Sequence, residues 1–315
     1  MVFNVSVIMP VYNAEFFIEK SVTSALQFDF VKEVILIEDG SIDNSLKICK
    51  KFADNSRVKL FQHEKGINKG AGASRNVGLR NAQYDFISFL DADDFYLPNR
   101  FDAELKVFQN QADADGVYGA LGVHFYEEEV KNIFMQKFGI ANAIVADNYL
   151  TTVKEDIDPK KLFQHLCGYD KTKGVFHLDT LTLKKTSLEK YNFCFNESLR
   201  LHQDSDFMLR LAYYFQLYSG DIGVPVAKRG IHLSNRITSI KNNTTTYYRN
   251  RSKLYRSLYN WSKKDKIPKK YISFFRYKFL VFYIQSIFPM QNIKLIINKF
   301  FGRKDLFTSI FQKRK

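Results

Sequence analysis

The sequence predicts an α/β protein with a mostly parallel central sheet and a C-terminal helical extension that is basic and aromatic. Over the first hundred residues, short apolar runs alternate with segments of helical length and period. This alternation is typical of right-handed βαβ units, which build parallel sheets. The hydrophobic fraction of 45% and the aromatic fraction of 16% exclude a disordered chain, and 315 residues suffice for a large core.

The elements follow from these patterns in chain order. Four runs rich in β-branched and aromatic residues are predicted strands, at residues 5–9, 33–37, 57–61 and 85–90. Helices are expected between them, at 14–27, 42–54 and 71–82. The second half is predicted to contain a helix at 99–111, a strand at 116–126, a strand at 175–184, a helix at 203–214 and a strand at 224–229. Residues 127–174 are weakly patterned, and we interpret them as an insertion.

Ligands of a parallel sheet bind at the carboxyl ends of its strands, so the residues after each predicted strand indicate the chemistry. Here these segments are Pro10-Val11-Tyr12-Asn13, Glu38-Asp39-Gly40-Ser41, His63-Glu64-Lys65-Gly66 and Asp91-Ala92-Asp93-Asp94. Two of the four are strongly acidic. The ends of the second and fourth predicted strands are therefore the candidate binding positions.

The strongest local signal is Asp91-Ala92-Asp93-Asp94. Because side chains alternate along a strand, Asp91 and Asp93 point to the same side and can converge on one ligand. Mg²⁺ or Mn²⁺ prefers carboxylate oxygens and shares its other positions with phosphates. The alternative interpretation is that these aspartates only cap the following turn and helix.

Two further segments fit a nucleotide. A carboxylate at Asp39 can accept a hydrogen bond from a base or a ribose, whereas a plain turn at Gly40 leaves Asp39 unexplained. The third predicted helix opens with small residues and then presents Arg75. A guanidinium at a helix start is well placed to neutralise a diphosphate.

Together these segments resemble the family 2 glycosyltransferases, which have the GT-A fold. The resemblance is carried by residues 5–13, by Glu38-Asp39-Gly40-Ser41, by residues 73–78 (ASRNVG) and by Asp91-Ala92-Asp93-Asp94. It implies an enzyme that moves a sugar from a nucleotide diphosphate donor, expected to be a UDP-sugar, to a hydroxyl of a growing lipid-linked or surface glycan. Inversion at the anomeric carbon and a divalent metal, Mn²⁺ or Mg²⁺, are also implied. The acidic segment then corresponds to the family's DXD motif.

The resemblance also implies roles for single residues. The nucleotide base is expected at Pro10, Tyr12 and Asp39. The nucleotide or diphosphate is expected at Arg75, the ribose at Asp91 and the metal at Asp93. His232 matches the family's late Arg-x-His segment, which can reach the diphosphate, although a lone histidine is more often structural.

The catalytic base of the family is an acidic residue, usually in a Glu-Asp pair at a helix start. Here the pair reads Gln203-Asp204, so Asp204 is the expected base. Asp206 stays open as a competitor, and Asp204 as a plain helix cap is the structural alternative. The missing Glu also leaves open a catalytically impaired nucleotide- or glycan-binding protein of the same fold.

The predicted organisation is a glycosyltransferase domain over 1–248, with a nucleotide-sugar-binding half at 1–98 and an acceptor half at 99–248. Residues 249–315 contain 18 basic and 2 acidic residues, whereas the preceding part carries a net charge of −2. Aromatic residues alternate with these cations, which suits an anionic membrane face. Packing of the aromatic faces into a helical subdomain, or into an interface with another protomer, is the alternative.

The remaining expectations concern location and partners. No basic segment followed by a long apolar stretch opens the chain, and the apolar run at 279–288 is shorter than the about 20 residues that span a bilayer. Three scattered cysteines indicate reduced thiols. We therefore expect a cytoplasmic protein, peripheral at the inner face of the cell membrane. A basic and aromatic tail also fits nucleic acid, but strand-end carboxylates would repel phosphates without a metal, so no nucleic-acid partner is expected.

Overall fold

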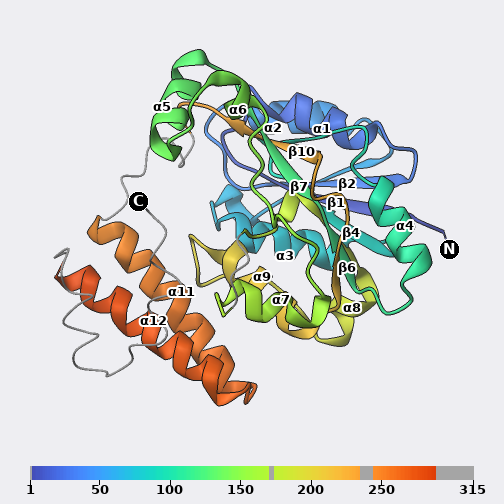
Figure 1. Ribbon diagram of the computed structural model, residues 1–315. Helices are drawn as coiled ribbons and strands as arrows, with labels where there is room; N and C mark the ends of the chain where they lie inside the picture. The colour runs from blue at the N-terminus through green and yellow to red at the C-terminus, as the bar shows by residue number, and fades with distance from the viewer. Residues whose placement is uncertain (1, 170–173, 235–243, 289–315) are drawn as a thin grey trace.

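The computed structural model of the chain describes residues 2–169, 174–234 and 244–288. Two sheets occupy the centre, with helices on both sides (Figure 1). Two long helices, α11 (Thr245–Lys264) and α12 (Lys269–Ile287), pack against each other at one end of the molecule (Figure 1). Among the described residues, none of the helices combines the length and the apolar character that a bilayer span requires.

The larger sheet has seven strands in the order β3-β2-β1-β4-β8-β6-β9. The strands are β1 (Val5–Val11), β2 (Val31–Glu38), β3 (Val58–Gln62), β4 (Phe86–Phe89), β6 (Gly116–Tyr118), β8 (Leu181–Lys184) and β9 (Leu217–Ser219). The first four pair in parallel, β8 runs antiparallel to both of its neighbours, and β6 pairs in parallel with β9. The predicted α/β class with a mostly parallel sheet is confirmed.

Four helices connect and flank the first strands, as the periodicity predicts. They are α1 (Ile18–Leu26), α2 (Ser45–Phe52), α3 (Ala71–Asn81) and α4 (Asp102–Asn110). Small residues of α3, including Gly72, Ala73 and Ser74, are buried, so this helix lies close to the sheet. That close packing brings the start of α3 to the carboxyl ends of the strands.

The single strand predicted at 116–126 is divided between two sheets. It changes sheet at Gly119, whose amide donates to the carbonyl of Thr180 at 3.0 Å. The second part, β7 (Ala120–Phe125), pairs with β10 (Pro225–Ile231), and β10 pairs with β5 (Phe95–Tyr96). The hydrophobic pattern continues across the division, which is why the sequence did not indicate it.

The described part of the weakly patterned stretch at 127–174 contains three helices, α5 (Glu128–Phe138), α6 (Ala143–Asp147) and α7 (Pro159–Leu166). Leu162 and Phe163 of α7 belong to the main core. The strand predicted at 175–184 is shorter than expected, because a 3₁₀ turn, η2 (Leu178–Thr180), precedes β8. After the short helix α8 (Lys185–Lys190), α9 occupies Gln203–Tyr214, as predicted.

The helical hairpin α11–α12 shares the core of the sheet. Leu258 and Phe275 of the hairpin lie in one buried cluster with Phe163 and with Phe207 of α9. Tyr255 and Phe282 stack on each other between the two helices, at 5.4 Å. Most aromatic side chains of the described tail are therefore packed, whereas Tyr283, Ile287 and Phe288 near the end of α12 are exposed.

Candidate active site

Three strand ends meet along one edge of the larger sheet. Strand β1 lies between β2 and β4, with Val11 opposite Glu38 and Ile8 opposite Phe89. The residues that follow these strands therefore start side by side. This register is why segments far apart in sequence can form one site.

The loop after β2 is held by Asp39. Its side chain is buried, and its two oxygens accept the amides of Lys69 and Gly70 at 2.6 and 2.8 Å. Gly40 follows with a φ of +74°, and a Cβ there would lie 2.5 Å from the carbonyl oxygen of Gly66, so only glycine fits this turn. Asp39 thus fixes the loop that leads into α3.

The other two residues predicted at the base lie on the neighbouring strand end. Pro10 is the penultimate residue of β1 and pairs with Ile37. Tyr12 follows the strand and has 49% of its surface exposed, which is unusual for a large aromatic residue. Pro10, Tyr12 and Asp39 are thus brought to one edge, with the ring of Tyr12 open to a ligand.

Arg75 of α3 joins this edge to the acidic segment after β4. Its Nη2 forms an ion pair with Asp91 Oδ1. Arg75 is only 3% exposed, yet its Nε and Nη1 have no hydrogen-bond partner among the described residues. A buried donor without a partner lowers stability by about 1–3 kcal/mol, and by more when it is charged. An anion bound at this guanidinium would remove that cost.

The acidic segment gathers three carboxylates. Oxygens of Asp91, Asp93 and Asp94 lie within 4.8 Å of one another. Asp94 is buried and accepts the amide of Gly230 at 2.9 Å. Asp93 keeps 34% of its side chain exposed, and its Oδ2 lies 3.2 Å from His232 Nε2. The predicted metal residue Asp93 and the predicted diphosphate residue His232 are therefore in contact.

His232 is fixed by its surroundings. Its ring stacks on Phe17 with a centroid distance of 4.2 Å, and the residue is 7% exposed. It directly follows β10, whose Gly230 approaches the acidic segment so closely that a Cβ would lie 2.1 Å from the carbonyl oxygen of Asp93. The second sheet thus packs directly onto the acidic segment.

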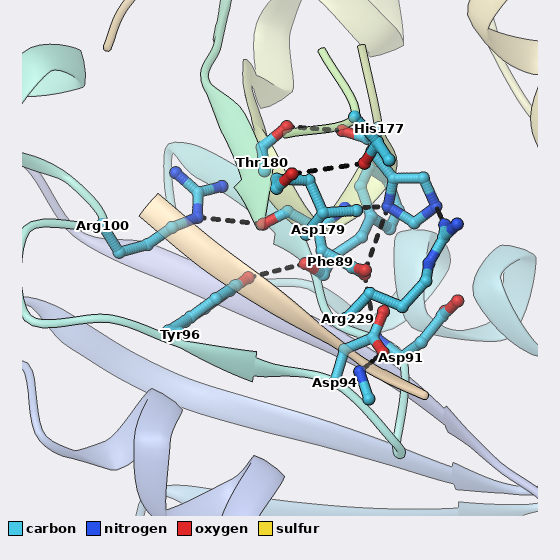
Figure 2. Close-up of polar contacts among 12 residues, drawn as sticks. Phe89, Asp91, Asp94, Tyr96, Arg100, His177, Asp179, Thr180 and Arg229 are labelled. Atoms are coloured by element: carbon cyan, nitrogen blue, oxygen red, sulfur yellow. Dashed lines mark hydrogen bonds and ion pairs between the residues drawn. The ribbon is translucent and has the colours of Figure 1, made fainter. Parts of the chain in front are cut away.

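A buried polar network adjoins the acidic segment (Figure 2), and the sequence did not indicate it. Asp179 of η2 accepts the amide of Asp91 at 3.0 Å, and its other oxygen lies 3.0 Å from His177 Nδ1. Arg100 donates to the Asp179 carbonyl at 3.0 Å, and Arg229 contacts His177. The network connects the acidic segment to η2 and β10.

Protonation within this network is uneven. Burial, and then the neighbouring Asp179, raise the pKa of Asp94 well above its ordinary value. Burial also raises the pKa of Asp179, but His177 and the hydrogen bond from Asp94 outweigh it and hold this pKa well below its ordinary value. Asp94 therefore holds a proton more readily than Asp179, and burial raises the pKa of Asp91 as well.

The start of α9 carries Asp204 and Asp206, the two aspartates between which the sequence did not decide. Asp204 is partly buried and accepts the amide of Ser205 at 2.8 Å. Burial raises its pKa, but the Ser205 amide and the charge of Arg75 outweigh burial and lower it. Asp204 therefore loses its proton more readily than an ordinary aspartic acid.

Asp206 has a different environment. It is fully buried, its Oδ2 accepts Arg210 Nε at 2.8 Å, and its Oδ1 accepts the hydroxyl of Ser257 at 2.7 Å. Both oxygens are thus engaged, Oδ2 within α9 and Oδ1 with Ser257 of α11. The geometry favours Asp204 as the aspartate available to a substrate.

A model of a protein family, described as Glycosyl transferase family 2, matches residues 6–165, which is just over half of the chain. The chain belongs to glycosyl transferase family 2. The match covers the strand ends, Arg75 and the acidic segment, whereas Asp204 and His232 lie beyond it.

Two relatives of this family 2 glycosyltransferase each match about a third of its length. An uncharacterized glycosyltransferase of Haemophilus influenzae is 44% identical over 104 residues, which is 32% of this chain and 41% of that protein. The Escherichia coli UDP-Glc:alpha-D-GlcNAc-diphosphoundecaprenol beta-1,3-glucosyltransferase WfgD is 38% identical over 104 residues, 33% of this chain and 40% of WfgD. The matched part thus spans less than half of either relative.

A solved structure confirms the predicted GT-A-type fold. The crystal structure of S. aureus TarS 1-349 in complex with UDP-GlcNAc superposes with a TM-score of 0.60 and 18% identity, covering 93% of this chain and 75% of that one. At this identity the likeness concerns the fold alone.

The side chains present fit a divalent cation. Asp91 and Asp93 are oxygen donors at one strand end, partly exposed, and close enough to bind one hard ion. A second set in the described residues, Asp94, His177 and Asp179, also has its ligand atoms within 4.8 Å. Those three are already engaged with one another, with Arg229 and with backbone amides, so the first set suits an exchangeable ion better.

Proposed function

We propose that this family 2 glycosyltransferase moves a sugar from a nucleotide diphosphate donor to a hydroxyl of an acceptor glycan. The observation that carries the proposal is the buried guanidinium of Arg75 beside Asp91, whose Nε and Nη1 have no hydrogen-bond partner in the part of the chain that the structure describes. A diphosphate supplies the oxygens that such a group needs. Pro10, Tyr12 and Asp39 would hold the base, and Asp91 the ribose.

Asp204 acts as the base. A sugar hydroxyl is a poor nucleophile, so a carboxylate must accept its proton as the oxygen attacks the anomeric carbon. Asp204 is ionised at neutral pH, because its pKa is lowered. Among the described residues its hydrogen bonds come from Ser205 and go to Oδ1, which leaves Oδ2 for a substrate. Displacement opposite the leaving group in one step inverts the anomeric carbon.

The departing nucleoside diphosphate needs its negative charge stabilised. Arg75 would supply one fixed positive charge, and His232, which stacks on Phe17 and contacts Asp93, would donate to a phosphate oxygen. A Mn²⁺ or Mg²⁺ ion on Asp93 would supply further charge neutralisation there.

A UDP-sugar is the proposed donor. Support comes from the name of WfgD, which prints a UDP-glucose donor and a diphosphoundecaprenol-linked acceptor. The TarS structure of the same fold was solved with UDP-GlcNAc. A growing lipid-linked or surface glycan is the proposed acceptor class.

We propose the same organisation as the sequence predicts, with a glycosyltransferase domain at 1–248, halves at 1–98 and 99–248, and a tail at 249–315. In the described part the helical hairpin already begins at Thr245, and residues 289–315 of the tail lie outside the described residues. The described tail holds 11 basic residues from Arg249 to Lys278 and one acidic residue, Asp265. With the exposed end of α12, this composition supports a peripheral position on an anionic membrane face inside the cell.

The test is release of nucleoside diphosphate from a panel of UDP- and other nucleotide-sugars, with and without Mn²⁺. Metal-stimulated release from one UDP-sugar supports the proposal. Gln203, in place of the family's usual Glu, favours the alternative of an impaired binding protein. Nucleotide binding without any release, across the panel and with glycan acceptors present, would support that alternative.

A further inference from the structure

One pocket of the described structure lies apart from the strand ends that form the candidate active site. It has a volume of about 880 Å³ and opens between residues 191–199, helix α9 and helix α11. Binding sites for small molecules measure about 300–1,000 Å³. None of the residues proposed for donor, metal or proton transfer lines this pocket, so the proposed reaction leaves it without a role.

The charges around the pocket do not balance. It is lined by four basic residues, Arg210, Lys253, Arg256 and Lys264, and by two acidic residues, Asp206 and Asp265. The acidic side chains are engaged, Asp206 with Arg210 and Ser257, and Asp265 with the hydroxyl of Tyr214. Within the described parts of the chain, Lys253, Arg256 and Lys264 form no ion pair, so the wall of the pocket carries unbalanced positive charge.

These cations share one face of α11. Lys253, Arg256 and Lys264 stand three and eight residues apart, a spacing that keeps side chains on the same side of a helix. All three are exposed, while Leu254 and Leu258 on the opposite side are buried in the core. The core therefore fixes the direction in which the positive face points.

The rest of the wall suits a sugar. Asn196 donates to Ser257 at 2.8 Å, and Asn260 adds a further amide, so hydrogen-bonding groups line one side. Trp261 and Tyr214 line the other side and are joined by a hydrogen bond of 3.2 Å. Aromatic rings pack against the apolar faces of sugar rings, and amides bind their hydroxyls.

Helix α9 connects this pocket to the proposed site of reaction. Asp204 and Arg210 are six residues apart, which corresponds to about 9 Å along a helix. We propose that the pocket binds an anionic part of the acceptor glycan, a sugar that bears a phosphate or a carboxylate, away from the hydroxyl that reacts. The inference rests on the proposed function, because it assigns the pocket to the acceptor of that reaction.

The two other candidate occupants fit less well. A bilayer surface is flat and does not enter a concave pocket, and a free phosphate leaves the amide and aromatic walls without a contact. A phosphorylated sugar uses the cations, the amides and the rings together. The class of ligand follows from that combination.

The test uses the full chain and three probes, glucose 6-phosphate, glucose and inorganic phosphate, with binding measured by calorimetry. Glucose 6-phosphate should bind more tightly than either of the others, and saturating UDP with Mn²⁺ should not displace it. The double variant Lys253→Gln/Arg256→Gln should weaken its binding by about tenfold or more, since two charge-assisted contacts are lost. The matched control is Lys269→Gln/Arg276→Gln, which removes one Lys and one Arg from exposed positions of the same hairpin outside the pocket and should change binding less than about twofold.

Several results would overturn the inference. These are equal losses in both double variants, displacement of glucose 6-phosphate by UDP, and equally tight binding of inorganic phosphate. A pocket variant that keeps glucose 6-phosphate but no longer binds phosphatidylglycerol vesicles would assign the cations to the membrane instead. The measurement needs no turnover, so the two failures can be told apart. A protein that transfers no sugar but binds glucose 6-phosphate through Lys253 and Arg256 would contradict the proposed function and the acceptor role, and would leave the pocket as a site for an anionic sugar.

Discussion

Asp204 and Asp206 stand two residues apart on α9 and differ in what their carboxylates can do. Asp206 has both oxygens bonded to side chains, one to Arg210 of the same helix and one to Ser257 of α11. Asp204 accepts hydrogen bonds from Ser205, and the charge of Arg75 helps to lower its pKa. Asp204→Asn should lower the turnover number by about 10²–10⁴-fold, the range for loss of a general base. The dissociation constant for UDP, measured by calorimetry, should stay within about threefold of wild type.

The matched control is Asp206→Asn. It should lower the melting temperature, since a hydrogen bond to a charged group contributes about 1.5–3 kcal/mol. The surviving folded protein should keep most of its turnover number. Wild-type turnover in Asp204→Asn would show that Asp204 is not the base. Loss of turnover in Asp206→Asn, at temperatures where the variant is folded, would make Asp206 the base instead.

The pH dependence follows from the same carboxylate. The pKa of Asp204 lies below the ordinary 3.8 of aspartic acid, because the Ser205 amide and Arg75 outweigh burial. The base therefore stays ionised as pH falls, until pH approaches that lowered pKa. The profile of kcat/KM should show no loss of a base between about pH 5 and pH 7. An acidic limb centred within this range, in protein that stays folded, would indicate another base.

Asp179 is expected to act through the acidic segment that it supports. Its oxygen accepts the amide of Asp91, so Asp179→Ala should let the segment shift. Loss of such a supporting contact weakens metal binding by about 10–100-fold. The concentration of Mn²⁺ that gives half-maximal UDP binding should rise accordingly, whereas UDP binding at saturating Mn²⁺ should largely recover. An unchanged Mn²⁺ requirement would assign Asp179 to stability alone.

At the residue scale, the sequence indicated the side chains that follow strands. It did not indicate the buried side chains that support them, such as Asp179. Asp39, Asp91 and Asp93 were predictable because carboxylates directly follow apolar runs. Asp179 lies before a strand, in a segment that carries no motif, and it reaches the site through a 3₁₀ turn. A charged residue within an otherwise apolar stretch was the signal available.

At the element scale, the approach of β10 to the acidic segment is decided by Gly230. A Cβ there would lie 2.1 Å from the carbonyl oxygen of Asp93, so Gly230→Ala must push β10 and the segment apart. Overpacking of this kind costs about 1–3 kcal/mol. Thermal unfolding should report that loss, and Mn²⁺-dependent UDP binding should weaken.

Gly223→Ala provides the comparison, because nothing lies within 4 Å of a Cβ at that position. Its stability and its UDP binding should match wild type. If Gly230→Ala binds UDP and Mn²⁺ as well as Gly223→Ala does, the second sheet does not shape the site.

The elements themselves were largely predictable, and the errors have physical reasons. Periodicity located β1, β2 and α9, because each has a continuous apolar face. It could not show that the strand at 116–126 changes sheet at Gly119, since both parts are buried and apolar. Helix α7 was missed because eight residues are too few for a clear period.

At the scale of the whole molecule, the hairpin α11–α12 and the sheet share one core. Leu254, Leu258 and Phe275 are buried in the cluster that contains Phe163 and Phe207. Differential scanning calorimetry should therefore give one cooperative transition, and not a separate one for the hairpin. Two resolved transitions would contradict this shared core. The basic and aromatic composition of the tail could be read from the sequence. The contacts that the hairpin makes with α7 and α9 could not, because composition does not show which elements pack together.

The central claim is that Arg75, the strand-end carboxylates and Asp204 surround one nucleotide diphosphate. A crystal structure with a UDP-sugar analogue and Mn²⁺, with the anomalous signal of manganese measured, tests this most directly. We expect a manganese peak at Asp93, the diphosphate against Arg75, and Asp204 facing the anomeric carbon. A nucleotide bound elsewhere, or Asp204 turned away from the sugar, would contradict it.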